Sequence, residues 1–320
     1  MRRLRRRSGV AAGTALAAFA LSAATAAAQV PGVTTGGAAR ISAQGATLTG
    51  HVNPRGLPTT YFFEYGTTTA YGARTTSAGA GRGTTAVAAA APVAGLTPAT
   101  RYHFRLVAQN ASGIARGGDR TFRAAPQPLG LALTATPNPV VFGGPVTIAG
   151  TLAGTGNAGQ TVQVQQRQFP FVGGFAPIGN AVVTDRQGRF AVGLVSVVLT
   201  TQYRAVLAGR PGVASPGITL GVQVVVRAKA SRTRVHRGGR VRFSGTVRPG
   251  EVGRPLAIQK RRGSRWVTVS GMLVRPRGAG FGVFGKTIRV RRGGDYRIFV
   301  GAGSGATVPT PSRSIRIRTT

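Results

Sequence analysis

The chain has 320 residues, of which 42 are Arg or Lys and only five are Asp or Glu, so its formal net charge is +37. The absence of cysteine excludes disulfides, thiolate metal sites and a cysteine nucleophile. At roughly 100–200 residues per domain, the length predicts two or three domains, each resting on its own hydrophobic core.

Residues 1–28 read as a secretory signal peptide. The basic run MRRLRRR precedes an Ala-rich apolar stretch, and Ala26, Ala27 and Ala28 form a small-residue cleavage site before Gln29. An uncleaved membrane anchor is the alternative, but this Ala-rich run is weakly hydrophobic for that role. We therefore expect a secreted protein, either extracellular or associated with the cell envelope.

Residues 29–38 are expected to be a linker, and residues 39–126 a first β unit. In TTYFFEYG, Tyr61, Phe63 and Tyr65 alternate with Phe62 and Glu64, which predicts a strand with one buried face. ATLTGHV, RYHFRLVAQN and DRTFRA add further strands. No segment has a sustained helical period.

The remainder contains an internal repeat. FGGPVTIAGTL, AGQTVQVQQR and QYRAVLAG match RGGRVRFSGTV, VGRPLAIQKR and DYRIFVGA at offsets of 95, 94 and 93 residues. A nearly constant offset predicts two copies of one domain, at 127–227 and 228–320. In each copy a Gly-Gly pair, beginning at Gly143 or Gly238, is expected to turn the chain into a strand through a positive φ angle.

The first unit resembles a fibronectin type III domain of the kind found in secreted bacterial proteins. The residues that carry the resemblance are Leu96, Pro98, Thr100, Tyr102, Phe104, Leu106, Ala108, Asn110 and Gly113. The resemblance implies a tyrosine corner built on Leu96, Pro98 and Tyr102, in which the Tyr102 hydroxyl bonds to backbone upstream. The sequence departs from the family at Leu48, where a Trp is usual.

The second and third units resemble bacterial immunoglobulin-like repeats in their strand pattern. The predicted fold is therefore all-β, with three tandem β-sandwich domains.

The acidic residues limit the chemistry. They are Glu64, Asp119, Asp185, Glu251 and Asp295, all far apart in sequence. Glycosidases need two neighbouring carboxylates and calcium sites need several oxygen ligands. The three histidines show no metal-ligand spacing. We therefore expect no catalytic residue, cofactor or metal. His103, which lies between two core aromatics, is expected on the solvent face without an acidic partner.

The basic residues are concentrated in one domain. Residues 227–320 hold 23 Arg and Lys against two acids, for a net charge of +21. Many alternate with apolar residues and should stand on the outer faces of strands of both sheets. The candidate contacts for an anionic polymer are Arg240, Arg242, Arg261, Arg262, Arg289, Arg291, Arg316 and Arg318.

Three interpretations of this charge remain open. The domain docks to anionic envelope polymers or acidic lipid headgroups, or the charge is only a bias of composition, or the domain binds nucleic acid. Single-strand binders interleave aromatics with their basic residues. Here Trp266 stands alone after KRRGSR, which disfavours nucleic acid.

Trp266 is the candidate for stacking on a sugar ring. Packing in the core or at its rim is the favoured reading, and the matched place in the second copy holds either Phe175 or a small residue. The sequence thus predicts a non-enzymatic, modular binding or adhesion protein with a basic C-terminal domain. A carbohydrate-binding accessory protein and a structural spacer without a ligand are the alternatives.

Overall fold

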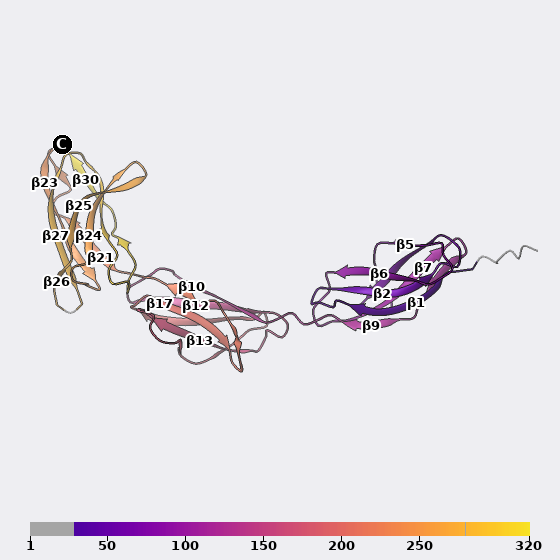
Figure 1. The fold of residues 1–320 in the computed structure, drawn as a ribbon. Coiled ribbons are helices and arrows are strands. Elements are labelled where there is room, and N and C mark those ends of the chain that lie inside the picture. The colour runs from indigo at the N-terminus through magenta and orange to yellow at the C-terminus, as the bar shows by residue number, and fades with distance from the viewer. Residues whose placement is uncertain (1–28, 279) are drawn as a thin grey trace, which may run out of the picture. The chain divides into compact units, whose positions relative to one another are not determined.

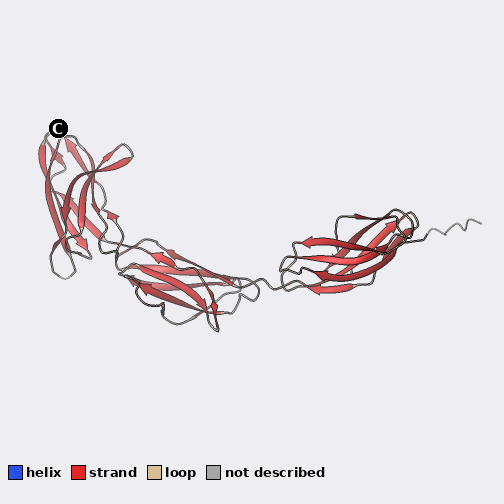
Figure 2. Cartoon of the chain, viewed as in Figure 1, coloured by secondary structure: helices blue, strands red, loops and turns tan. Residues whose placement is uncertain are grey.

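The computed structural model describes residues 29–278 and 280–320, so the predicted signal peptide lies outside the described residues. The described chain is built of strands, which confirms the all-β fold (Figures 1 and 2). Within these ranges no helix is long and apolar enough to cross a membrane. Backbone contacts divide the chain into two units between Ala125 and Pro126, next to the predicted end of the first domain.

The first unit is a sandwich of two antiparallel sheets. One sheet has the order β1-β2-β6 and the other β4-β3-β7-β8, with β5 beside β3 and β9 beside β7. The strands are β1 (Gly32–Ala39), β2 (Gly45–Asn53), β3 (Thr59–Gly66), β4 (Ala73–Arg74), β5 (Ala78–Gly81), β6 (Val87–Ala94), β7 (Arg101–Asn110), β8 (Gly113–Arg116) and β9 (Arg120–Arg123).

The core of this sandwich follows the predicted alternation. Phe63 of β3 and Phe104 of β7 are fully buried with Leu48, which fills the place where a Trp is usual in the family. The tyrosine corner is present, because the Thr97 N–H donates to the Tyr102 hydroxyl oxygen at 2.9 Å. The resemblance therefore gave the right role for Tyr102.

The predicted linker at 29–38 is wrong for most of its length. Strand β1 occupies Gly32–Ala39 and pairs with β2 in antiparallel register. Five of its eight residues are Gly or Ala, which have little intrinsic preference for a strand. It is held instead by tertiary contacts, such as the bond from the Leu106 N–H to the buried Thr35 hydroxyl.

The second unit contains two further sandwiches. The first of these has sheets β10-β12-β16 and β14-β13-β17-β18, and a short parallel pair of β11 and β20. Its strands are β10 (Gly130–Thr136), β11 (Val140–Val141), β12 (Gly144–Ala153), β13 (Thr161–Gln168), β14 (Ala176–Pro177), β15 (Val182–Val183), β16 (Arg189–Val197), β17 (Thr201–Leu207), β18 (Arg210–Ala214), β19 (Ile218–Leu220) and β20 (Val222–Gln223).

The third sandwich has the sheets β21-β23-β27-β26 and β22-β30-β28-β24-β25. Its strands are β21 (Val225–Ala230), β22 (Arg234–Val235), β23 (Gly239–Arg248), β24 (Pro255–Arg262), β25 (Arg265–Leu273), β26 (Arg275–Pro276), β27 (Gly282–Val290), β28 (Gly294–Val300), β29 (Thr310–Pro311) and β30 (Ile315–Thr319).

The internal repeat is confirmed at the level of strands, because its three blocks fall on β12, β13 and β17 in one copy and on β23, β24 and β28 in the other. Gly143 and Gly238 have φ angles of 76° and 85°, as the Gly-Gly turns predict. The predicted boundary at 227/228 is displaced, since β21 begins at Val225 and pairs with β23 of the third sandwich.

Within the second unit, the loop at 301–308 of the third sandwich forms hydrogen bonds with the second sandwich. Its Ala306 carbonyl accepts a bond from the Thr200 N–H, and its Val308 N–H donates to the Val222 carbonyl, each at 2.8 Å. Arg254, which is only 2% exposed, packs against this loop. Burial lowers the pKa of Arg254.

The Arg254 guanidinium bonds to the Gly301 carbonyl at 2.9 Å and to the Thr307 hydroxyl. It lies 3.7 Å from the carboxylate of Glu251, which itself accepts from the Ser304 N–H at 2.6 Å. The buried Arg254 and the partly exposed Glu251 therefore hold the loop together.

Candidate functional site

All five carboxylates of the chain are paired with a basic side chain. The pairs are Glu64–Arg105, Asp119–His103, Asp185–Arg189, Glu251–Arg254 and Asp295–Arg316, with closest N–O distances from 2.6 to 3.7 Å. No group of three or more metal-ligating side chains occurs among the residues that the structure describes. The acidic groups thus stabilise local structure.

The expectation that His103 has no acidic partner is wrong. Its Nδ1 lies 2.8 Å from Asp119 Oδ2, and the other Asp119 oxygen accepts from the Tyr71 hydroxyl at 3.0 Å. Burial, followed by this bond, raises the pKa of Tyr71. Asp119 lies in the loop just before β9. Strand β9 pairs with β7, and this pairing places Asp119 beside His103.

The eight predicted basic contacts are all exposed. Arg240, Arg242 and Arg289 lie on β23 and β27 of one sheet, whereas Arg261, Arg262, Arg316 and Arg318 lie on β24 and β30 of the second sheet. The expectation that Arg291 stands on a strand is wrong, because β27 ends at Val290 and Arg291 lies in the turn that follows. Both sheets are therefore basic on their outer sides. One of the eight is already paired, since Arg316 bonds to Asp295 at 3.0 Å.

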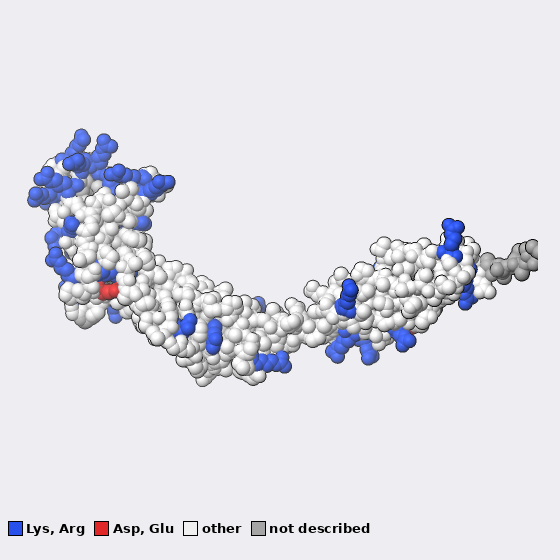
Figure 3. Space-filling view, in the orientation of Figure 1, with Lys and Arg blue, Asp and Glu red and all other residues white. Residues whose placement is uncertain are grey.

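The highest concentration of charge lies at the end of the third sandwich that carries the C-terminus (Figures 1 and 3). Arg240 lies opposite Arg289, and Arg234 lies beside Arg318. The Gly238 N–H donates to the Val290 carbonyl, which brings the turn holding Arg237 next to Arg291. We call this set of exposed side chains the basic end: Arg234, Arg237, Arg240, Arg289, Arg291 and Arg318. Among the described contacts, no carboxylate pairs with any of the six.

A hollow beside β21 adds further cations to the third sandwich. Its volume is about 870 Å³, and hydroxyls of Ser244, Thr246, Ser312 and Ser314 line it. Four exposed basic residues share the lining: Arg227, Lys229, Arg277 and Arg313. Sequence reasoning missed this group, because β21 had been divided between two domains.

Trp266 does not pack in the core. It lies half-buried on β25, and the Arg297 guanidinium carbon lies 4.3 Å from the centre of its ring. The Arg297 Nε donates to the Gln259 side-chain oxygen at 2.8 Å. Trp266 therefore supports an arginine on the outer face of the sheet, rather than covering the hydrophobic core.

The same arrangement occurs in the second sandwich. Arg204 donates from Nε to the Gln165 oxygen at 2.8 Å, and its guanidinium lies 4.4 Å from the ring of Phe175. Phe175 is thus the structural counterpart of Trp266. The guanidinium carbon of a further arginine, Arg167, lies 4.8 Å from the centre of the same Phe175 ring. Arg167 donates to the Gln202 side-chain oxygen through Nε and Nη2.

The first sandwich has a third version of this site. Arg105 lies 4.6 Å from the Tyr71 ring, and its Nε donates at 2.6 Å to a carboxylate, Glu64, in place of glutamine. In all three sandwiches the arginine and its partner are directly opposite in register, as Arg105–Glu64, Arg204–Gln165 and Arg297–Gln259. In the sequence, the only sign of this shared site was the Tyr-Arg pair at matched positions of the two repeats, in QYR (202–204) and DYR (295–297).

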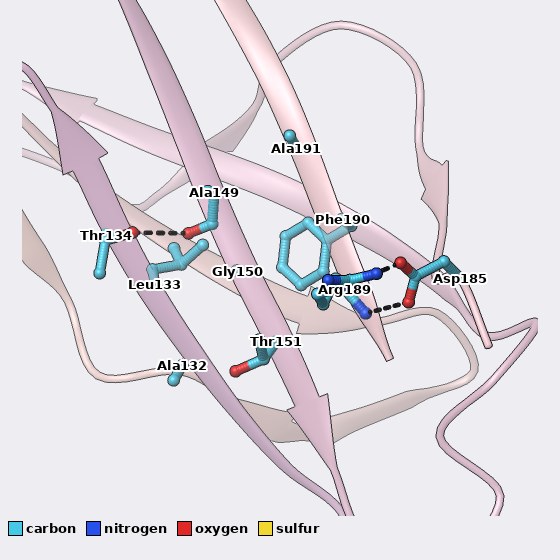
Figure 4. A pocket seen from close by; sticks show the side chains of 10 residues that line it. All are labelled: Ala132, Leu133, Thr134, Ala149, Gly150, Thr151, Asp185, Arg189, Phe190 and Ala191. Atoms are coloured by element: carbon cyan, nitrogen blue, oxygen red, sulfur yellow. Dashed lines mark hydrogen bonds and ion pairs between the residues drawn. The ribbon is translucent and has the colours of Figure 1, made fainter. Parts of the chain in front are cut away.

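A shallow hollow on the sheet β10-β12-β16 is lined mainly by small residues such as Ala132, Ala149 and Ala191 (Figure 4). At its rim Asp185 accepts from the backbone N–H groups of Gln187 and Arg189, each at 2.8 Å. These bonds, led by that of the Arg189 N–H, hold the pKa of Asp185 below its usual value. Asp185 therefore closes a turn.

No protein-family model matches the chain. No curated protein matches it either. Among solved structures, it is similar to the FN1–FN3 domains of chicken CNTN1, with 16% identity, a TM-score of 0.29 and coverage of 91% of this chain and 99% of that one. It is also similar to domains A168–A170 of titin, with 15% identity, a TM-score of 0.37 and coverage of 90% and 99%. The assignment of the fold rests on the strand topology described above.

Proposed function

We propose that the protein is a non-enzymatic, secreted or cell-surface binding module whose third sandwich docks onto anionic polymers of the cell envelope. The observation that carries this proposal is the basic end, with six exposed arginines and no carboxylate partner among the described contacts. A field of this size attracts polyanions without requiring a shaped pocket.

The environment of the acids supports a non-enzymatic role. Each of the five carboxylates is held by a basic partner, and the hydrogen bonds of Asp185 and Glu251 close a turn and hold a loop. No two of the five carboxylates pair with the same basic side chain. Secretion is supported by the Arg-rich and Ala-rich sequence of residues 1–28.

Nucleic acid and neutral sugar fit the described surface less well. The ring of Trp266, the single tryptophan of the chain, already has a guanidinium against it. An aromatic that stacks on a base or on a sugar needs a free face. Electrostatic attraction to an anionic partner is therefore the interaction that the surface of the third sandwich supports best.

The test is retention of the chain 29–320 on cell-wall fragments that carry anionic polymers, with a neutral polysaccharide resin as the control. We expect retention at low salt and release as salt rises, because the Debye length shortens from about 10 Å at 0.1 M to about 3 Å at 1 M. Absence of retention at low salt would favour the spacer role instead.

A further inference from the structure

The three arginines on the outer sheet faces differ in one respect. The partner of Arg105 is a carboxylate, whereas the partners of Arg204 and Arg297 are amides. Glu64 neutralises the guanidinium that it contacts. Gln165 and Gln259 accept the same Nε hydrogen bond but carry no charge, so the two guanidinium groups remain fully positive.

Arg204 and Arg297 are also held in place before any ligand arrives. Each is half-buried, is bonded through Nε and lies against an aromatic ring. A guanidinium fixed on its face and at Nε loses little side-chain entropy on binding. Among the described contacts, the terminal nitrogens of both side chains have no hydrogen-bond partner, so their two parallel donors are available to a carboxylate.

Around Arg204 the positive charge is doubled. Arg167 stands against the same Phe175 ring, and its own partner, Gln202, is another amide. The only acid of this sandwich, Asp185, is engaged by Arg189 at the far sheet. Two cations beside one ring, without an acid near them, favour the binding of an anion.

We propose that Arg204 and Arg297 are matched receptor sites for carboxylate groups, and that their ligand is an acidic polysaccharide of uronic acid units. The first sandwich shows the chemistry of the occupant, because there the carboxylate of Glu64 lies against the same arginine. Two copies of one site in a single chain suit a polymer with a repeated carboxylate, which gains avidity by engaging both. The proposal rests on the proposed function only for the anionic character of the polymer.

The substitutions that test these sites are Gln165→Glu and Gln259→Glu, together in the chain 29–320. Each places a carboxylate where the first sandwich has Glu64, and thereby closes the site from within. Gln109→Glu together with Gln127→Glu is the matched control, since this pair adds the same two charges at exposed positions. The fold should tolerate the change, as the Glu64–Arg105 pair shows, and thermal unfolding checks this.

The probe is oligogalacturonate, at a salt concentration high enough to suppress non-specific electrostatic binding. Dextran is the neutral control polymer, and dextran sulfate is the control polymer that carries sulfate in place of carboxylate. We expect the double variant to bind oligogalacturonate about tenfold more weakly, the effect of losing a charge-assisted hydrogen-bonded pair. Trp266 fluorescence reports on the Arg297 site, because the chain contains no other tryptophan. It should respond to oligogalacturonate in the control and respond less in the double variant.

Equal binding by the double variant and the control would overturn the proposal, as would an equal or stronger response to dextran sulfate. A second variant, in which Arg240 and Arg289 are both replaced by Gln, distinguishes this proposal from the proposed function. That change should weaken retention on cell-wall fragments while the Trp266 response to oligogalacturonate persists. Loss of the response in that variant would show that no separate carboxylate site exists at Arg297.

Discussion

Arg240 on β23 and Arg289 on β27 lie directly opposite each other in the antiparallel pair. Like charges at opposed positions destabilise a sheet by about 0.2–1 kcal/mol. The third sandwich retains this repulsion on an exposed face, where a polyanion would relieve it.

Replacing Arg240 with Thr should therefore stabilise the domain at low salt and weaken its retention on anionic polymer. The expected gain in the free energy of unfolding is about 0.5 kcal/mol. Arg242→Thr is the control. Arg242 lies opposite Thr287, so this change removes the same charge without relieving the repulsion between Arg240 and Arg289. Equal stabilisation by both changes, measured by chemical denaturation, would argue against repulsion between Arg240 and Arg289.

Arg254→Met should be strongly destabilising. The change leaves the Gly301 carbonyl, the Thr307 hydroxyl and Glu251 without their buried partner. We expect a loss of about 3 kcal/mol in the free energy of unfolding. Arg275→Met, at an exposed position of β26, should stay within about 0.5 kcal/mol.

Limited proteolysis gives a second measure of the contact between Arg254 and the loop. The loop at 301–308 should be cleaved faster in Arg254→Met than in the unaltered chain. Resistance to cleavage, together with unchanged stability, would show that Arg254 does not hold the loop.

Asp185 predicts a pH dependence. Its pKa is lowered in the folded chain, chiefly by the Arg189 N–H, so its charged form is favoured by folding. The stabilisation is present above the unfolded pKa, near 3.8, and is lost as pH falls through the lower folded value. An NMR titration of the carboxyl carbon should show this low midpoint, and Asp185→Asn should flatten that part of the stability profile. A midpoint at or above the unfolded value would contradict the turn geometry.

Tyr102→Phe should cost about 1 kcal/mol of stability in the first sandwich, since it removes the acceptor of the Thr97 N–H. Tyr65→Phe is the matched control, because Tyr65 is only partly buried and its hydroxyl makes no bond among the described contacts. Calorimetry of the full chain should resolve the difference. Equal losses from the two changes would mean that the corner bond contributes nothing.

The sandwich architecture could be predicted from sequence because its signals are local. Alternation at Tyr61, Phe63 and Tyr65 marks a strand, and the Leu96–Tyr102 spacing marks a corner. Strand β1 was missed because its Gly and Ala residues disfavour a strand, which forms here through pairing with β2. The burial of Arg254 was missed for a related reason, since its partners lie about 50 residues away in sequence.

The candidate sites were predicted only in part. The exposure of the basic residues follows from period-two alternation, which holds for Arg240 and Arg242. The carboxylate receptor sites did not follow, because their aromatic members come from different places. Trp266 lies on a strand, and Phe175 lies before the short strand β14, at a position where the repeat has a gap. Only the fold brings these rings to equivalent arginines.

The most direct test of the central claim compares equal losses of charge in two domains. One variant replaces four arginines of the basic end with Gln: Arg237, Arg240, Arg289 and Arg291. The other replaces four exposed arginines of the first sandwich: Arg82, Arg101, Arg116 and Arg120. The salt concentration that releases each chain 29–320 from cell-wall fragments is then measured. The proposed function predicts a much lower release point for the first variant than for the second, and equal release points would contradict it.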